Sequence, residues 1–273
     1  MRIFTLLLFV ALLFLPVLTW SKGPAGVVYG VHNHSVSGVD PYSQTVGSSI
    51  YATNTDQVCV FCHTPHGGSL DGPLWNRENP NPGSWSHYNS ATLSVDLGLS
   101  LGRTPNQETL LCLSCHDGSV SVNHVSNPPS SPFTDGGDAI ATLFGNDPNN
   151  VIYGDLLYGG PGKRIGASWA ASNSTGDLSD DHPISFSYTE VLDSDPYTLG
   201  PKGGTLKSAD AARQNGDGVR FFGDDVTENF VECSSCHDPH VNYTQALGGN
   251  PAYEPFLIMS NSGSALCLAC HTK

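Results

Sequence analysis

Four short repeats fix where this chain can hold a cofactor. Each has the pattern C-x-x-C-H, and together they use all 8 cysteines. The pattern is the attachment signature of c-type haem, in which both thiols bond covalently to the porphyrin and the histidine becomes the proximal iron ligand. The sequence therefore predicts four covalent haem c groups. The attaching cysteines are Cys59, Cys62, Cys112, Cys115, Cys233, Cys236, Cys267 and Cys270, and the proximal ligands are His63, His116, His237 and His271.

Paired cysteines have two other common uses. Cys-x-x-Cys pairs also form zinc knuckles, and an exported protein can join its cysteines as disulfides. Neither use requires a histidine immediately after the second cysteine, yet all four repeats have one. The repeated histidine therefore favours haem.

The N-terminus predicts export. Met1 and Arg2 precede an apolar run at 3–18, followed by small and polar residues, which is typical of a secretory signal peptide. Cleavage after Ser21 or after Ala25 both remain open, and the first domain is assigned to 1–21. An uncleaved anchor is the alternative, but the run is shorter than the roughly 20 residues that span a bilayer. We expect a secreted protein at the cell surface or outside the cell, with the periplasm as the alternative, and no integral membrane protein after processing.

The composition is unusual for a globular domain. The chain has 30 Gly, 19 Pro and only 13% charged residues, so side-chain burial alone would hardly offset the entropy lost on folding. Covalent haems would supply much of the missing apolar core. The predicted fold class is a loop-rich multihaem c-type cytochrome, with short helices and a few short strands organised around four covalent haems. A net charge of −14 argues against nucleic acid and anionic membranes as partners.

An internal duplication divides the chain. The first half contains C-V-F-C-H-T-P-H and then L-C-L-S-C-H, whereas the second contains C-S-S-C-H-D-P-H and then L-C-L-A-C-H. This predicts an N-terminal haem pair in 22–118 and a C-terminal pair in 230–273. Between them, 119–229 is expected to be a loop-rich insert, with a strand near 184–190 where apolar and polar residues alternate. The haem motifs themselves are expected on short helices.

Histidines supply the second axial ligand in this interpretation. Only Met1 and Met259 could give a thioether, whereas seven histidines remain after the proximal four. His66 and His240 follow a proximal histidine by three residues, so each projects to the same side as that ligand and is expected to reach a different haem. The alternative for both is an exposed polar histidine.

These segments together resemble a known group of proteins. N-H-S near the N-terminus, C-x-F-C-H-T-P-H-G, P-L-W-N, L-C-L-S-C-H-D-G, D-D-H-P-I-S-F, C-S-S-C-H-D-P-H and L-C-L-A-C-H are similar to the extracellular tetrahaem cytochromes that polymerise into conducting filaments, the cytochrome nanowires. The resemblance implies bis-His irons and a homopolymer with head-to-tail contacts, in which one histidine is shared between subunits. It implies His34, His66, His182 and His240 as distal ligands, and we expect His34 to be the one that crosses.

The remaining candidates are weaker ligands. His32 would point away from His34 on an extended segment, and His34 is favoured. His87 and His124 are expected to be packing or surface residues, and Met259 is expected in the core. The sequence thus predicts electron transfer between redox partner proteins and external acceptors, without enzymatic activity. A soluble periplasmic shuttle and a multihaem reductase with one open haem are the alternatives.

Overall fold

The computed structural model describes the segments that carry all four motifs. The described residues are 25–30, 32–38, 51–52, 55–80, 85–88, 104–116, 122, 124–128, 142–143, 177–179, 181–194, 206–214, 217–223, 229–243 and 248–272. The predicted signal segment at 1–21 lies outside them. None of the helices in these segments has the length and apolar character needed to cross a bilayer.

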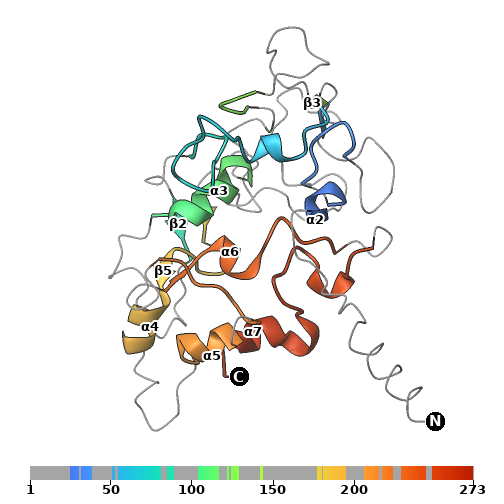
Figure 1. Ribbon diagram of the computed structural model, residues 1–273. Helices are drawn as coiled ribbons and strands as arrows, with labels where there is room; N and C mark the ends of the chain where they lie inside the picture. Colours follow the sequence, from blue (N-terminus) through green and yellow to red (C-terminus); the bar gives the residue numbers. More distant parts are fainter. Residues whose placement is uncertain are drawn as a thin grey trace, which may run out of the picture.

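Short helices separated by loops make up most of the described chain (Figure 1). The longest is α3, with 10 residues. The α-helices are α2 (Ala25–Val28), α3 (Gln107–His116), α4 (Tyr188–Ser194), α5 (Ala209–Arg213), α6 (Cys233–Cys236) and α7 (Ala265–Cys270), and the 3-10 helices are η1 (Cys59–Phe61), η5 (Pro251–Tyr253) and η6 (Ser262–Ser264). This loop-rich arrangement agrees with the architecture expected from the composition.

The strands are two residues long and form three separate pairs in the described part of the chain. β1 (Tyr51–Ala52) pairs antiparallel with β3 (Thr142–Leu143), β2 (Ser86–His87) pairs parallel with β4 (Asp177–Leu178), and β5 (Phe186–Ser187) pairs antiparallel with β6 (Phe230–Val231). Such small ladders fasten distant loops to one another but cannot form a layer that covers a core.

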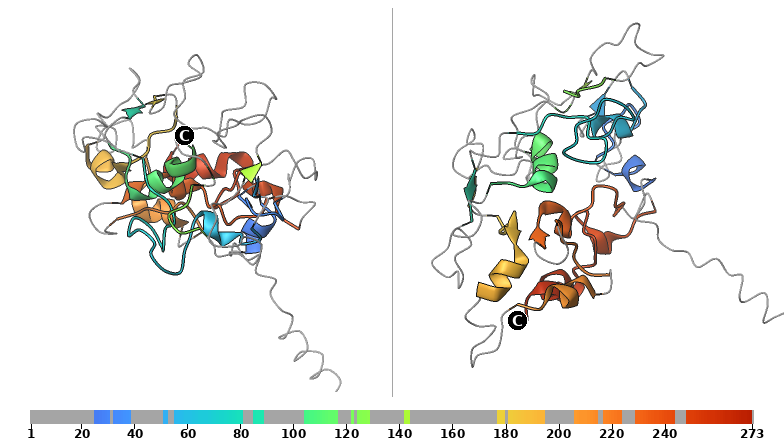
Figure 2. Two further views of the ribbon diagram at one scale, coloured as in Figure 1. Left: turned by 90° about the horizontal axis from the view of Figure 1, so that it is seen from above. Right: turned by 60° about the vertical axis from the view of Figure 1, so that its left-hand side comes forward.

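The helices of the motifs follow one another through the molecule. In Figure 1, α3 lies above α6, and α5 and α7 lie below it. The right-hand view of Figure 2 keeps this order, and α3 contacts α6 while α5 contacts α7. The second, third and fourth motifs are therefore arranged in sequence order along the molecule.

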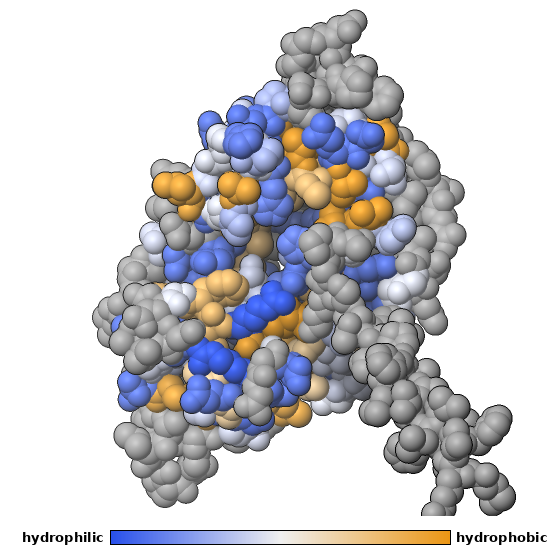
Figure 3. Space-filling model, viewed as in Figure 1, coloured by the Kyte–Doolittle hydropathy of each residue, from blue (hydrophilic) through white to orange (hydrophobic). Residues whose placement is uncertain are grey.

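Among the described residues, apolar side chains gather in three small clusters. They are centred on Phe61, on Tyr188 and on Ile258. Attaching cysteines pack against all three, with Cys62 and Cys115 on the first and Cys270 on the other two. Other hydrophobic residues remain open at the surface (Figure 3), including Leu70 and Leu74. The side chains of the described residues thus form little continuous interior.

The strand predicted near 184–190 is much shorter in the structure. Only Phe186 and Ser187 are extended, and α4 begins at Tyr188. The Ser187 hydroxyl accepts a hydrogen bond from the Glu190 backbone N–H, as a helix N-cap does. Tyr188 and Val191 are both buried at helical spacing. Apolar and polar residues therefore stop alternating at Tyr188, where buried residues begin to recur at helical spacing.

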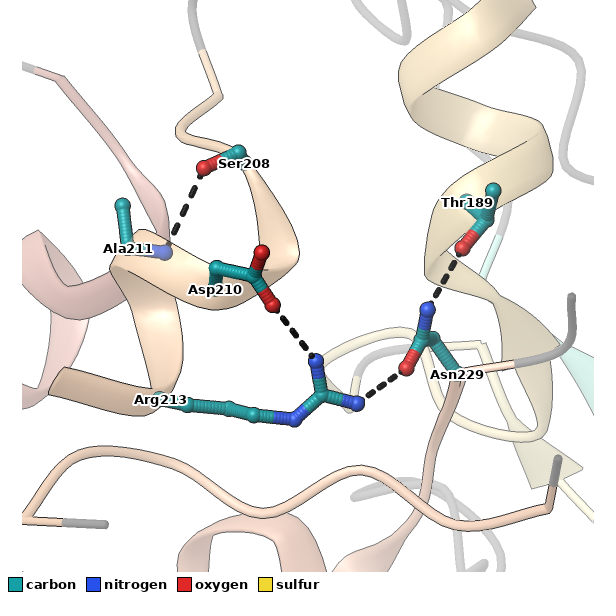
Figure 4. A network of polar contacts seen from close by, with 6 residues as sticks. All are labelled: Thr189, Ser208, Asp210, Ala211, Arg213 and Asn229. Carbon is teal, nitrogen blue, oxygen red and sulfur yellow. Dashed lines mark hydrogen bonds and ion pairs between the residues drawn. The ribbon is translucent and has the colours of Figure 1, made fainter. Parts of the chain in front are cut away.

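A polar network fixes α5 against α4, also inside the predicted loop-rich insert (Figure 4). The Ser208 hydroxyl accepts from the Ala211 N–H and caps α5. At the other end, the Arg213 guanidinium donates to the Asn229 side-chain oxygen, and the Asn229 amide donates to the Thr189 hydroxyl at 2.8 Å. These helices, which composition did not reveal, position the segment that leads into the third motif.

Candidate haem-binding sites

Each C-x-x-C-H motif occupies a helical turn. α6 and α7 contain the third and fourth cysteine pairs, and the second pair lies in the last turns of α3. In the first motif, Cys59 begins η1 and Cys62 follows it as the C-cap. The histidine N–H of His63, His237 and His271 closes the turn by donating to the carbonyl of the first cysteine of its motif, at 2.8–3.0 Å. Because residues three and four apart share one side of a turn, both thiols and the imidazole of a motif are presented together. The prediction that the motifs lie on short helices is confirmed.

All eight cysteines are free thiols in the structure. No disulfide bond joins any two of them. Burial raises the pKa of Cys62 and of Cys236 to about 12. Within the described ranges, no group of three or more His, Cys, Asp and Glu side chains converges as a metal site would require.

Thiols from successive motifs are neighbours. Cys112 on α3 and Cys233 on α6 are hydrogen-bonded to one another, and this contact, together with burial, raises the pKa of Cys112. Cys62 lies near Cys115, which adds to its raised pKa, and Cys236 lies near Cys270 in the same way. The predicted attachment points thus form one series from the first motif to the fourth, with Cys59 and Cys267 exposed and the other six cysteines half-buried.

Two proximal histidines are oriented by backbone carbonyls. The Nδ1 of His63 donates to the carbonyl of Pro73 at 2.7 Å, and the Nδ1 of His237 donates to the carbonyl of Pro255 at 2.9 Å. A carbonyl can only accept, so the proton is on Nδ1 and the Nε2 lone pair is available to a metal. This is the usual arrangement of a ligating histidine and its supporting partner.

His240 faces the first proximal histidine. The rings of His63 and His240 have centroids 6.3 Å apart, and their planes differ by 12°. Two metal–imidazole bonds of about 2 Å each, plus the distance from each nitrogen to its ring centre, require about 6 Å between the centroids. The pair therefore fits an iron held from both sides. The reach of His240 to a different haem from that of His237 stays a prediction.

His32 lies opposite the second proximal histidine. Its ring centroid is 6.0 Å from that of His116, with the planes at 66°. The Nδ1 of His32 is buried without a hydrogen-bond partner. Burial, followed by the neighbouring His116, His34 and His240, lowers the pKa of His32 well below its usual value, which favours the neutral, ligating form.

The structure places His34, the histidine favoured from the sequence, beside His32. His34 is buried, with its ring 6.2 Å from that of His32 and 5.6 Å from that of Phe61. The segment is turned instead of extended, because the Asn33 side-chain oxygen accepts from both the backbone N–H and the hydroxyl of Ser35. Alternation along a strand therefore could not decide between the two histidines.

The fourth motif has His182 in its surroundings. Burial and the nearby His182 lower the pKa of His271. The Nδ1 of His182 donates to the carbonyl of Pro183 at 2.8 Å, which leaves its Nε2 unoccupied by this contact. His182 was selected from sequence, and the structure brings it to the vicinity of the predicted proximal ligand.

Of the remaining candidates, His66 is exposed. All 11 histidines belong to the described residues, and among them no imidazole is in ring contact with His237. His87 lies on β2 and His124 is exposed. Met259 packs against the cluster around Ile258, as expected for a core residue.

Asp238 is a neighbour of these sites that sequence reasoning missed. Its carboxylate accepts from the Nδ1 of His240 at 2.8 Å and forms an ion pair with Arg220 at 3.1 Å. Burial alone would raise its pKa, but the side-chain and backbone hydrogen bonds of His240, with the contact from Arg220, outweigh burial and lower the pKa to about 2. The difference between T-P-H in the first half and D-P-H in the second was the available signal.

Comparison of the sequence with known protein families found no matching family, and comparison with curated proteins found no similar sequence.

Proposed function

We propose that this chain is a tetrahaem c-type cytochrome that transfers electrons without substrate chemistry. The observation that carries the proposal is the pairing of His63 with His240 at 6.3 Å, the separation that two axial ligands of one iron need. Haem bound at these motifs supplies a reversible one-electron couple. Further support comes from two other predicted proximal ligands that have a second histidine nearby, His116 with His32 and His271 with His182.

The residues of the chain have distinct tasks in this proposal. The cysteines attach the four haems and, because thiols of successive motifs are neighbours, keep the groups in one series. The three histidine pairs would each hold a haem iron through two imidazoles, which would leave those irons no open position for a substrate and would lower the potential relative to His/Met ligation. The carbonyls of Pro73 and Pro255 fix the proton on Nδ1 of their histidines.

A filament is the proposed assembly, with head-to-tail contacts between copies and electrons delivered to an external acceptor. The resemblance to filament-forming cytochromes motivates it, and two observations bear on the shared ligand. His237 is exposed and has no histidine ring against it among the described residues, and His66 is exposed as well. His66 is therefore better placed to reach another copy than His34, which is only 9% exposed.

Mass spectrometry of the purified chain, together with electron microscopy of material sheared from the cell surface, tests the proposal. We expect four covalent haems per chain and ordered filaments. His66→Ala would then prevent assembly while keeping the haem content. Four haems on a chain that remains monomeric would overturn the filament and favour a soluble shuttle. A chain without covalent haem would overturn the cytochrome assignment itself.

A high-spin ferric haem in the assembled protein would instead favour the reductase. That alternative needs one open axial position, which an absorption or electron paramagnetic resonance spectrum detects directly.

A further inference from the structure

The two halves of the duplication differ in the residue two positions before the second histidine. In the first half, Thr64 precedes Pro65 and His66, and its hydroxyl donates to the backbone carbonyl of His66 at 2.9 Å. In the second half, Asp238 takes the place of Thr64, and its carboxylate contacts the imidazole of His240. Equivalent positions therefore hold a neutral group in one half and an acidic group in the other.

Asp238 is held firmly in that place. One carboxylate oxygen, Oδ1, accepts both the backbone N–H of His240 at 3.0 Å and the imidazole Nδ1 at 2.8 Å. The other oxygen, Oδ2, accepts from Arg220 at 3.1 Å. The backbone N–H of Asp238 donates to the carbonyl of Phe256 at 2.7 Å. With 8% of its surface exposed, Asp238 is set by these contacts and not by solvent.

This contact differs in kind from those of two proximal histidines. His63 and His237 donate their Nδ1 protons to neutral carbonyls, whereas His240 donates to a carboxylate. A carboxylate behind a ligating imidazole fixes its tautomer and increases its basicity. A more basic axial ligand favours the ferric iron and so lowers the reduction potential, as second-shell hydrogen bonds do at haem centres.

We propose that Asp238 is a positioning residue that directs the Nε2 of His240 to the iron and lowers the potential of the haem shared by His63 and His240. The inference rests on the proposed function, because it requires haem at the first motif. Arg220 moderates the effect, since its positive charge offsets part of the carboxylate charge.

Spectroelectrochemical titration of the haem-loaded full chain tests the inference. His240→Ala first identifies which potential belongs to this haem, through its conversion from low to high spin. In Asp238→Asn we expect four low-spin haems and a higher potential for that haem, with about a tenfold larger ferrous-to-ferric ratio at a fixed electrode potential. Tenfold corresponds to about 59 mV for a one-electron couple. Asp238→Thr, which installs the residue of the first half, should shift the potential in the same direction.

Two further variants separate this role from a general effect of charge. Arg220→Gln should lower the same potential, since it exposes His240 to an uncompensated carboxylate. Asp210→Asn removes an acid that is 98% exposed on α5 and should leave the potential unchanged. Equal potentials in Asp238→Asn and wild type, or shifts of the same sign in Asp238→Asn and Arg220→Gln, would overturn the inference. Absence of covalent haem, or an unchanged spin state in His240→Ala, would instead show that the underlying haem assignment had failed.

Discussion

Thr109 donates a hydrogen bond of 2.5 Å to the carboxylate of Glu232, 123 residues further along the chain. Ser185 donates to the same oxygen at 2.8 Å, while the other oxygen, Oε1, is buried without a partner. Glu232 is the N-cap of α6, and Thr109 lies on α3. One buried acid therefore joins the helix of the second motif to the helix of the third.

This acid makes stability depend on pH. Burial raises the pKa of Glu232 from 4.5 to about 7, so the folded chain keeps a proton that the unfolded chain has already lost. The free energy of unfolding should therefore fall as the pH rises from about 4.5 to about 7 and then level off, by about 3 kcal/mol in total. In the haem-loaded Glu232→Gln variant, the free energy of unfolding measured by thermal unfolding should not fall over this pH range.

The matched control is Glu190→Gln, which changes an exposed acid on α4. It should keep the wild-type dependence on pH. A decline of the same size in Glu232→Gln would show that another group is responsible.

Spectroscopy can decide between His32 and His34 as the second ligand. His32→Ala should convert one low-spin haem to high spin, because His32 faces His116 at 6.0 Å. Covalent haem content should not change, since the thioether bonds remain. His34→Ala is the control and should retain the low-spin spectrum of that haem. The opposite outcome for the two variants would restore the assignment drawn from the resemblance.

His182→Ala should similarly affect only the fourth haem. His182 is the histidine whose proximity lowers the pKa of His271. We expect one haem to lose its low-spin spectrum while the mass of the chain still includes four haems. His124→Ala, at an exposed position, is the comparison and should have no spectral effect. An unchanged spectrum in His182→Ala would remove His182 from the ligand set.

Packing around α3 gives a prediction about stability. Leu113 is completely buried, so Leu113→Ala should lower the free energy of unfolding by about 2–5 kcal/mol through lost contacts and an internal cavity. Leu70 is 99% exposed, and Leu70→Ala should leave stability within about 0.5 kcal/mol of wild type. Denaturant unfolding of the haem-loaded protein measures both. Similar losses in both variants would mean that burial at Leu113 contributes little.

The sequence was most informative where chemistry imposes local geometry. Two thiols and an imidazole within five residues can reach one group only from a helical turn, and the turns are found at all four motifs. Periodicity was less informative at Tyr188, because a serine cap changed the backbone from strand to helix.

Long-range placement was the hardest to obtain from sequence. The side-chain network of Asn33 turns the N-terminal segment, in which the ring of His32 lies 6.0 Å from that of His116. Likewise, the contact of Asp238 with His240 depends on how a short D-P-H segment bends. Neither depends on hydrophobic pattern, which is the main signal that a single sequence provides.

The division of the apolar interior into three small clusters has a practical consequence for producing this protein. If the chain carries the proposed haems, a host that cannot attach them should export an unfolded polypeptide that proteases degrade, whatever its rate of synthesis. Yield would then depend more on the capacity of the host to attach haem than on transcription. A cysteine variant that fails to accumulate would indicate a defect in haem attachment and not a defect in conduction.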